Sequence, residues 1–151
     1  MFLQKLNALF SAPVAVTRPD ARAAVAELLV HASMIDGKLD DSEAKARDRL
    51  LKDKFGLSDS ELESMVADAE AEYEDAIDFY RFTSAIKDAY DRDQRETIVE
   101  MLCEIILADG TITDEEMNMG WRIAGLLGFD NREWVMIRKR VEDRSQNDKP
   151  D

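Results

Sequence analysis

Two acidic turns hold the side chains of this chain that are suited to metal chemistry. Each turn reads Asp-Gly, one residue, an aliphatic residue, three residues and then Glu, and the two turns stand 73 positions apart. Carboxylate oxygens are the ligands that Ca²⁺ and Mg²⁺ prefer. The pattern predicts a loose site for Ca²⁺ or Mg²⁺, whose candidate ligands are Asp36, Asp40 and Glu43 in the first turn and Asp109, Asp114 and Glu116 in the second.

The spacing also occurs in the second half of an EF-hand loop, where Asp, Gly, an aliphatic residue and Glu fill the fifth, sixth, eighth and twelfth positions. The first half of such a loop is absent. Positions one and three would hold Ala32 and Met34 in the first turn, and Ile105 and Leu107 in the second. None of these side chains binds a hard cation, so an ordinary EF-hand is excluded. If the turns met across a pseudo-twofold axis, their carboxylates could share ions.

The same residues also suit a structural role. The glycine can end one helix, the aliphatic residue can anchor the turn, and the glutamate can cap the next helix. Thr113 and Glu116 match the Ser/Thr-x-x-Glu capping box, and Asp40 with Glu43 forms a weaker version of it. A third interpretation makes the acidic turns a docking surface for a protein partner, and it is compatible with either of the others.

Catalytic groups are not indicated. The chain has one histidine, His31, and one cysteine, Cys103, so the two-histidine metalloprotease motif is absent, and no Ser-His-Asp candidate set is evident. No glycine-rich phosphate loop is present. A helical apolar run surrounds Cys103, which we expect to be a small buried hydrophobic residue. We therefore expect no enzymatic activity.

Composition limits the classes of partner and the location. The chain has 151 residues, 45% of them hydrophobic and 35% charged, with a formal net charge of −13. Such a surface repels phosphate backbones and anionic lipid headgroups, so nucleic-acid binding is not expected. No apolar run approaches the roughly 18 residues of a membrane span, and the start lacks the pattern of a secretory signal. We expect a cytoplasmic protein that attracts cations or a basic partner.

Hydrophobic periodicity predicts an all-α fold of about eight helices in a single bundle, built from two pseudo-repeated helix-turn-helix units. Four helices are expected over about 2–10, 21–35, 41–54 and 76–90. Another is expected to begin at a capping box at Ser58–Glu61, one is expected on each side of the second acidic turn, and the last is expected after Asp130. The charged stretch 91–95 is expected to be a turn. The predicted organisation is a short amphipathic helix and linker at 1–19, a helical domain at 20–144 and a polar tail at 145–151.

The expected helix at 2–10 has an apolar face formed by Phe2, Leu3, Leu6, Leu9 and Phe10. It carries a single lysine, whereas helices that lie on membranes are rich in basic residues. Docking on its own domain or on a partner is the leading interpretation. Peripheral contact with the inner face of the membrane is the alternative.

Both turns continue into a longer pattern. The first follows Glu-Leu-Leu-Val-His-Ala-Ser-Met-Ile at 27–35, and the second follows Ile-Ile-Leu-Ala at 105–108. With their closing glutamates, these segments resemble the tellurite-resistance TerB-like family, which also supplies the N-terminal region of the DjlA membrane co-chaperone. The segments 1–10, 76–83 and 123–128 are similar to a stand-alone bacterial branch of that family, and the resemblance covers residues 1–142.

The resemblance implies an all-helical bundle with internal pseudo-symmetry and a metal-linked stress or signalling role. It places the family's acidic positions on Asp36, Glu43, Asp109 and Glu116. The His-Pro-Asp tripeptide of J-domains is absent, so direct co-chaperone activity is not expected.

The leading functional expectation is a non-enzymatic, stress-associated module that binds a protein partner and is tuned by a divalent cation at its two acidic turns. A purely structural interaction domain without metal is the first alternative. A membrane-peripheral adaptor anchored through residues 2–10 is the second.

Overall fold

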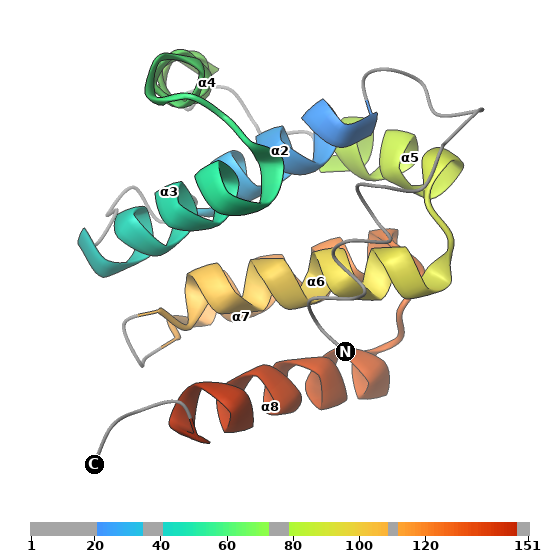
Figure 1. Ribbon diagram of the computed structural model, residues 1–151. Helices are drawn as coiled ribbons and strands as arrows, with labels where there is room; N and C mark the ends of the chain where they lie inside the picture. Colours follow the sequence, from blue (N-terminus) through green and yellow to red (C-terminus); the bar gives the residue numbers. More distant parts are fainter. Residues whose placement is uncertain (1–20, 35–40, 73–78, 109–111, 148–151) are drawn as a thin grey trace.

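The computed structural model describes residues 21–34, 41–72, 79–108 and 112–147 (Figure 1). Every regular element in these ranges is a helix, which confirms the all-α prediction. The expected helix at 2–10 lies outside the described residues. The helices are α2 (Ala21–Ala32), α3 (Asp41–Phe55), α4 (Asp59–Glu72), α5 (Phe79–Ala89), α6 (Arg92–Ile106), α7 (Asp114–Leu126) and α8 (Asn131–Asn147).

The helices form two units of three. The first unit comprises α2, α3 and α4, the second comprises α6, α7 and α8, and Figure 1 shows the first above the second with α5 between them in the chain. In each unit a glycine with positive φ follows the second helix, Gly56 at 68° and Gly128 at 98°. Glycine adopts this conformation without a Cβ clash and so ends a helix readily. The repeat therefore extends to a third helix in each unit.

The first helix of each unit supplies the centre of the core. Val25, Leu28 and Leu29 of α2 are fully buried, and so are Val99 and Met101 of α6. Helix α2 packs on α3, α4 and α5, while α6 packs on α7 and α8 and also contacts α2 and α3. Burial of these apolar faces, at roughly 25 cal/mol per Å², is the main force that holds the two units together. Trp134, Ile137 and Val141 of α8 are also buried.

Helix α6 begins earlier than the sequence suggested, and the prediction of a turn at 91–95 was wrong. The backbone N–H of Gln94 donates to Oδ1 of Asp91 (2.9 Å), and the N–H of Asp91 donates to Oε1 of Gln94 (2.9 Å). This reciprocal pair is a capping box, which starts a helix at Arg92. Charge density suggested a turn, whereas the spacing of Asp and Gln decided the local structure.

Two further helix ends differ from expectation. Helix α2 ends at Ala32 rather than near residue 35, and Ser33 and Met34 form a turn closed by a hydrogen bond from Met34 N to His31 O (3.1 Å). Helix α8 continues to Asn147, three residues into the stretch that was expected to be a polar tail.

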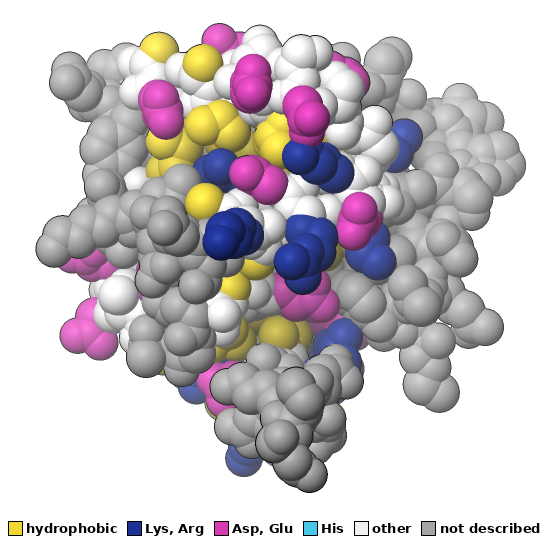
Figure 2. All heavy atoms as spheres, turned by 60° about the vertical axis from the view of Figure 1, so that its left-hand side comes forward, with side chains coloured by type: hydrophobic (Ala, Val, Ile, Leu, Met, Phe, Trp, Pro, Cys, Tyr) yellow, Lys and Arg dark blue, Asp and Glu magenta, His cyan; other side chains and the backbone are white. Residues whose placement is uncertain are grey.

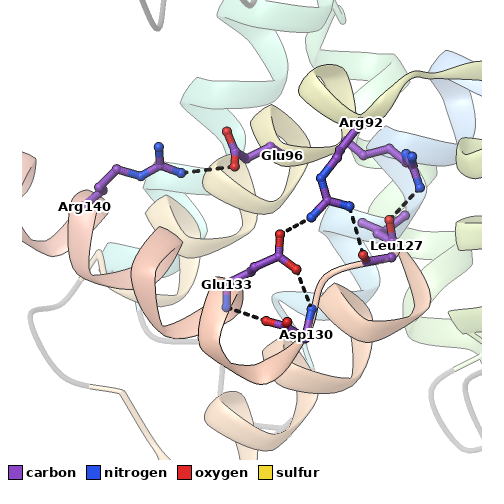
Figure 3. Close-up of polar contacts among 8 residues, drawn as sticks. Arg92, Glu96, Leu127, Asp130, Glu133 and Arg140 are labelled. Carbon is purple, nitrogen blue, oxygen red and sulfur yellow. Dashed lines mark hydrogen bonds and ion pairs between the residues drawn. The ribbon is translucent and has the colours of Figure 1, made fainter.

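Arginines at the start of α6 connect the end of α7 to the start of α8 (Figure 3). Nη1 of Arg95 donates to the carbonyl oxygen of Leu127 (2.8 Å), and Nη1 of Arg92 donates to that of Gly128 (3.2 Å). Arg92 also forms an ion pair with Glu133, whose other oxygen accepts from Asp130 N (3.1 Å). Helix C-terminal carbonyls lack partners within their own helix, so these bonds satisfy them and fix the order of the three helices.

Candidate functional site

Most of the predicted cation ligands fall outside what the structure describes. Asp36, Asp40 and Asp109 belong to undescribed stretches, and Glu43 lies in the described helix α3 without a described side chain. The structure therefore neither assembles nor separates the two acidic turns.

The described part of the second turn has a structural role. Oε1 of Glu116 accepts from Thr113 N (3.0 Å), and Glu116 N donates to Oγ1 of Thr113 (3.1 Å), which confirms the predicted capping box. Glu116 is only 3% exposed, while its neighbour Asp114 is exposed. Within the described ranges, no three His, Cys, Asp or Glu side chains are placed to hold a metal ion. Binding of Ca²⁺ or Mg²⁺ at the turns stays a prediction.

The interface between α7 and α8 is closed by one aromatic contact. Trp134 is 2% exposed, and its indole lies against the backbone of Gly120, where an added Cβ would stand 2.7 Å from Cζ2. One turn away, Arg138 contacts the sulfur of Met117. A large ring opposite a residue without a side chain fills this interface completely, as dense packing in protein interiors requires.

The matching interface of the first unit has different residues. Arg47 of α3 and Gly120 of α7 each stand four residues after the glutamate that ends their Asp-Gly turn. Leu62 of α4 and Trp134 of α8 each directly follow the glutamate of a capping box. The first unit therefore carries a long side chain in place of glycine, and a smaller side chain in place of tryptophan. The contact that closes the second unit has no counterpart in the first.

A groove remains between α3 and α4 at this place, with a volume of about 270 Å³. Arg47 forms part of its wall and is 4% exposed. The Arg47 guanidinium donates to Oγ of Ser33 (3.2 Å) and pairs with Asp48 (3.0 Å), so its buried charge is satisfied. We call this hollow the α3–α4 groove; from α3 it is lined by Arg47, Asp48 and Lys52, and from α4 by Asp59, Leu62, Glu63, Val66, Ala67 and Glu70.

The α3–α4 groove has an apolar strip bordered by charge. Lys52 forms an ion pair with Asp59, and this hydrogen bond raises the pKa of Lys52. Glu63 and Glu70 are exposed, and the groove as a whole has two more acidic than basic side chains. Figure 2 shows this side of the molecule: in its upper part, at the level of α4, apolar side chains are visible among acidic and basic ones.

A smaller cavity of about 90 Å³ lies between α2, α4 and α5. His31 in its wall is 6% exposed and stacks on Phe82 with 5.2 Å between ring centroids, so it is a packed residue. Glu27, Asp68 and Arg81 supply the charged part of the lining. A space of this size admits a few water molecules and is far smaller than the roughly 300–1,000 Å³ of a small-molecule site.

The remaining buried polar groups belong to the core. Glu100 of α6 is 3% exposed and accepts from Nη2 of Arg144 (3.2 Å), with Nη2 of Arg140 at 3.5 Å. This cluster ties α6 to α8 across 44 positions of sequence. Cys103 is fully buried, and burial raises the pKa of its thiol far above the ordinary value. The thiolate is the reactive form of cysteine, so Cys103 is a core residue, as the sequence predicted.

Sequence reasoning missed the α3–α4 groove. The repeat was recognised at the two acidic turns, whereas the difference lies in the helices that follow them. When the two units are aligned in sequence, Arg47 stands at the position of Gly120 and Leu62 at the position of Trp134. This difference in side-chain size is visible in the sequence.

The family of the chain follows from comparison with known proteins. A family model described as "Tellurite resistance protein TerB" matches residues 22–139, which span α2 through most of α8. No curated protein and no solved structure gives a significant match. Among the described residues, no helix is long and apolar enough to cross a membrane. Because the family model covers well over half of the sequence, the chain belongs to the TerB tellurite-resistance family.

Proposed function

We propose that this TerB-family chain is a non-enzymatic helical module that binds a protein partner through the α3–α4 groove. The observation that carries the proposal is the difference between the two units. Trp134 against Gly120 closes the interface of the second unit, whereas Arg47 and Leu62 leave about 270 Å³ open at the matching place in the first. An apolar strip left open between two helices offers a place for another molecule's side chain.

The size and lining of the two cavities support an interaction role over catalysis. The volumes of about 270 and about 90 Å³ lie below the range of small-molecule sites, roughly 300–1,000 Å³. The larger one fits a single large side chain. Its bordering charges are exposed or already paired, whereas acid-base catalysis uses a carboxylate whose pKa is shifted by a closed, apolar site.

Site-specific photocrosslinking in cells that express the full chain tests this proposal. A photoreactive phenylalanine analogue would replace Ala67, which lines the α3–α4 groove, and in a matched control it would replace the exposed Lys87 of α5. We expect a discrete crosslinked product of higher mass from position 67 and none from position 87. Equal labelling at both positions, or none at either, would contradict the proposal.

A further inference from the structure

The first unit has a groove between α3 and α4, whereas the second unit has an exposed tryptophan, Trp121, beside the contact between α7 and α8. Trp121 of α7 is 47% exposed, and Val135 of α8 is 39% exposed. Trp121 follows Gly120 and Val135 follows Trp134, the two residues in contact. Helices α7 and α8 run antiparallel, because Met117 lies one turn before Gly120 in α7 while its partner Arg138 lies one turn after Trp134 in α8. In antiparallel helices the residues that directly follow two contacting residues lie on the same side of the interface. Trp121 and Val135 therefore share one outer side.

Basic side chains are exposed on the two helices that carry Trp121 and Val135, whereas the groove has an excess of acidic ones. Arg122 and Lys139 are exposed, and α7 and α8 together contain six basic and six acidic residues. Helix α4 contains six acidic residues and no basic one. In a chain with a net charge of −13, α7 and α8 thus lack the acidic excess that α4 has, and Arg122 and Lys139 can oppose the acidic side chains of α4. Opposed charges of this kind set the orientation in which two proteins meet.

We propose that a second copy of this chain docks head to tail, with its Trp121 in the α3–α4 groove of the first. This inference rests on the proposed function and names the partner. It accounts for two features that are otherwise unexplained: an exposed tryptophan and a groove whose counterpart holds a tryptophan. The indole would cover Leu62 and Val66 and approach the cation of Lys52, which favours an aromatic face. The basic residues beside it would then oppose Glu63 and Glu70.

The contact is one that a single copy cannot make with itself. Figure 1 places α4 at the top of the molecule and α8 at the bottom, with α7 between them, so α4 and α8 lie at opposite ends. A head-to-tail contact between different surfaces leaves each added copy with a free groove, so the assembly grows until it closes into a ring or continues as a filament. The association therefore depends on protein concentration.

Complementary variants test the contact in the full chain. Sedimentation velocity over a concentration series would follow the wild type, Trp121→Ala, and Ala67→Trp, which fills the groove. We expect the wild type to form a ladder of oligomers, and each variant alone to associate at least about tenfold more weakly, because tryptophans at interface centres carry much of the binding energy. An equimolar mixture of the two variants should form dimers that grow no further, since only one good groove meets one good Trp121. Tyr80→Ala, which removes another exposed aromatic side chain, is the matched control and should associate like the wild type.

A surface-charge variant keeps the test sharp if Ala67→Trp misfolds. Glu63→Lys with Glu70→Lys changes two exposed side chains of the groove and should also abolish association of that variant alone. Mixing it with Trp121→Ala should restore dimers, because the intact groove of Trp121→Ala meets the intact Trp121 of the charge variant. A wild-type chain that stays monomeric at every concentration would overturn the self-docking inference. Crosslinking from position 67 to a different protein would then still support the proposed function. Oligomers that persist in Trp121→Ala would also overturn the inference.

Discussion

The indole of Trp134 on α8 rests on the backbone of Gly120 on α7, so this position tolerates no side chain. Both residues are buried, and the distance from an added Cβ to Cζ2 would be 2.7 Å. This pair is one difference between the two units. It fills the interface of the second unit, and its absence leaves the α3–α4 groove in the first.

Gly120→Ala should destabilise the protein by about 1–3 kcal/mol, the usual cost of overpacking a core, because Trp134 must move. Gly125→Ala is the matched control on the same helix. A Cβ at Gly125 meets no atom within 4 Å, so that change should stabilise the protein by about 0.4–1 kcal/mol through lower chain entropy in the unfolded state. Urea unfolding followed by circular dichroism measures both. Equal effects of the two substitutions would refute the packing argument.

The Thr113–Glu116 capping box separates the structural and metal interpretations of the acidic turn. Thr113→Ala removes the side-chain acceptor for Glu116 N and should cost about 1 kcal/mol of unfolding free energy, whereas Thr113→Ser should cost little. Thermal unfolding with and without added Ca²⁺ or Mg²⁺ measures the effect. If capping is the whole role of the turn, neither ion shifts the melting temperature of the wild type.

Calorimetric titration of Ca²⁺ and Mg²⁺ tests the predicted site directly. The wild type would be compared with a double variant, Asp109→Asn with Glu116→Gln. Saturable heat that the double variant loses would establish a cation site at the second turn, since each substitution replaces a candidate carboxylate ligand by an amide. If capping is the only role of the turn, no such heat appears, because the buried Glu116 carboxylate then serves only as the hydrogen-bond partner of Thr113 N.

Glu61 should make α4 sensitive to acid. The backbone N–H of Ser58 donates to the Glu61 carboxylate (3.1 Å) and lowers its pKa below the ordinary value. The folded state thus binds this proton less tightly than the unfolded state. The stabilisation is present above the unfolded pKa and is lost as pH falls through the folded one. The stability difference between wild type and Glu61→Ala, measured by urea unfolding, should therefore shrink from pH 7 towards pH 3. A constant difference would show that the charge of Glu61 plays no part.

Glu104 should show the opposite dependence. Burial raises the pKa of this carboxyl, while Arg144 and Lys54 oppose the shift. The folded state therefore holds the proton more tightly than the unfolded state, and stability declines as pH rises through the folded pKa. Glu104→Gln removes the ionisable group, so its stability relative to wild type should increase between pH 4 and pH 7. A relative stability that falls over this range would contradict the assignment.

The sequence alone determined most of the helices and their caps. The Ser58–Glu61 and Thr113–Glu116 capping boxes were predicted correctly because they depend on residues within about one turn of each other. The start of α6 was equally local, through Asp91 and Gln94, but its charged residues suggested a turn. The charged composition of residues 91–95 indicated a turn, whereas the three-residue spacing of Asp91 and Gln94 forms the capping box that starts the helix.

Only the tertiary structure decided what the two interfaces became. In the sequence, Arg47 resembles a surface residue. It can be buried to 4% exposure because Ser33, in the turn after α2, and its neighbour Asp48 satisfy its guanidinium. The need for glycine at Gly120 likewise depends on a ring from another helix, Trp134. Contacts across an interface depend on the volumes of side chains that are distant in sequence, and helical periodicity carries no information about these volumes. The groove, and with it the proposed docking site, therefore became visible only once α3 and α4 were placed side by side.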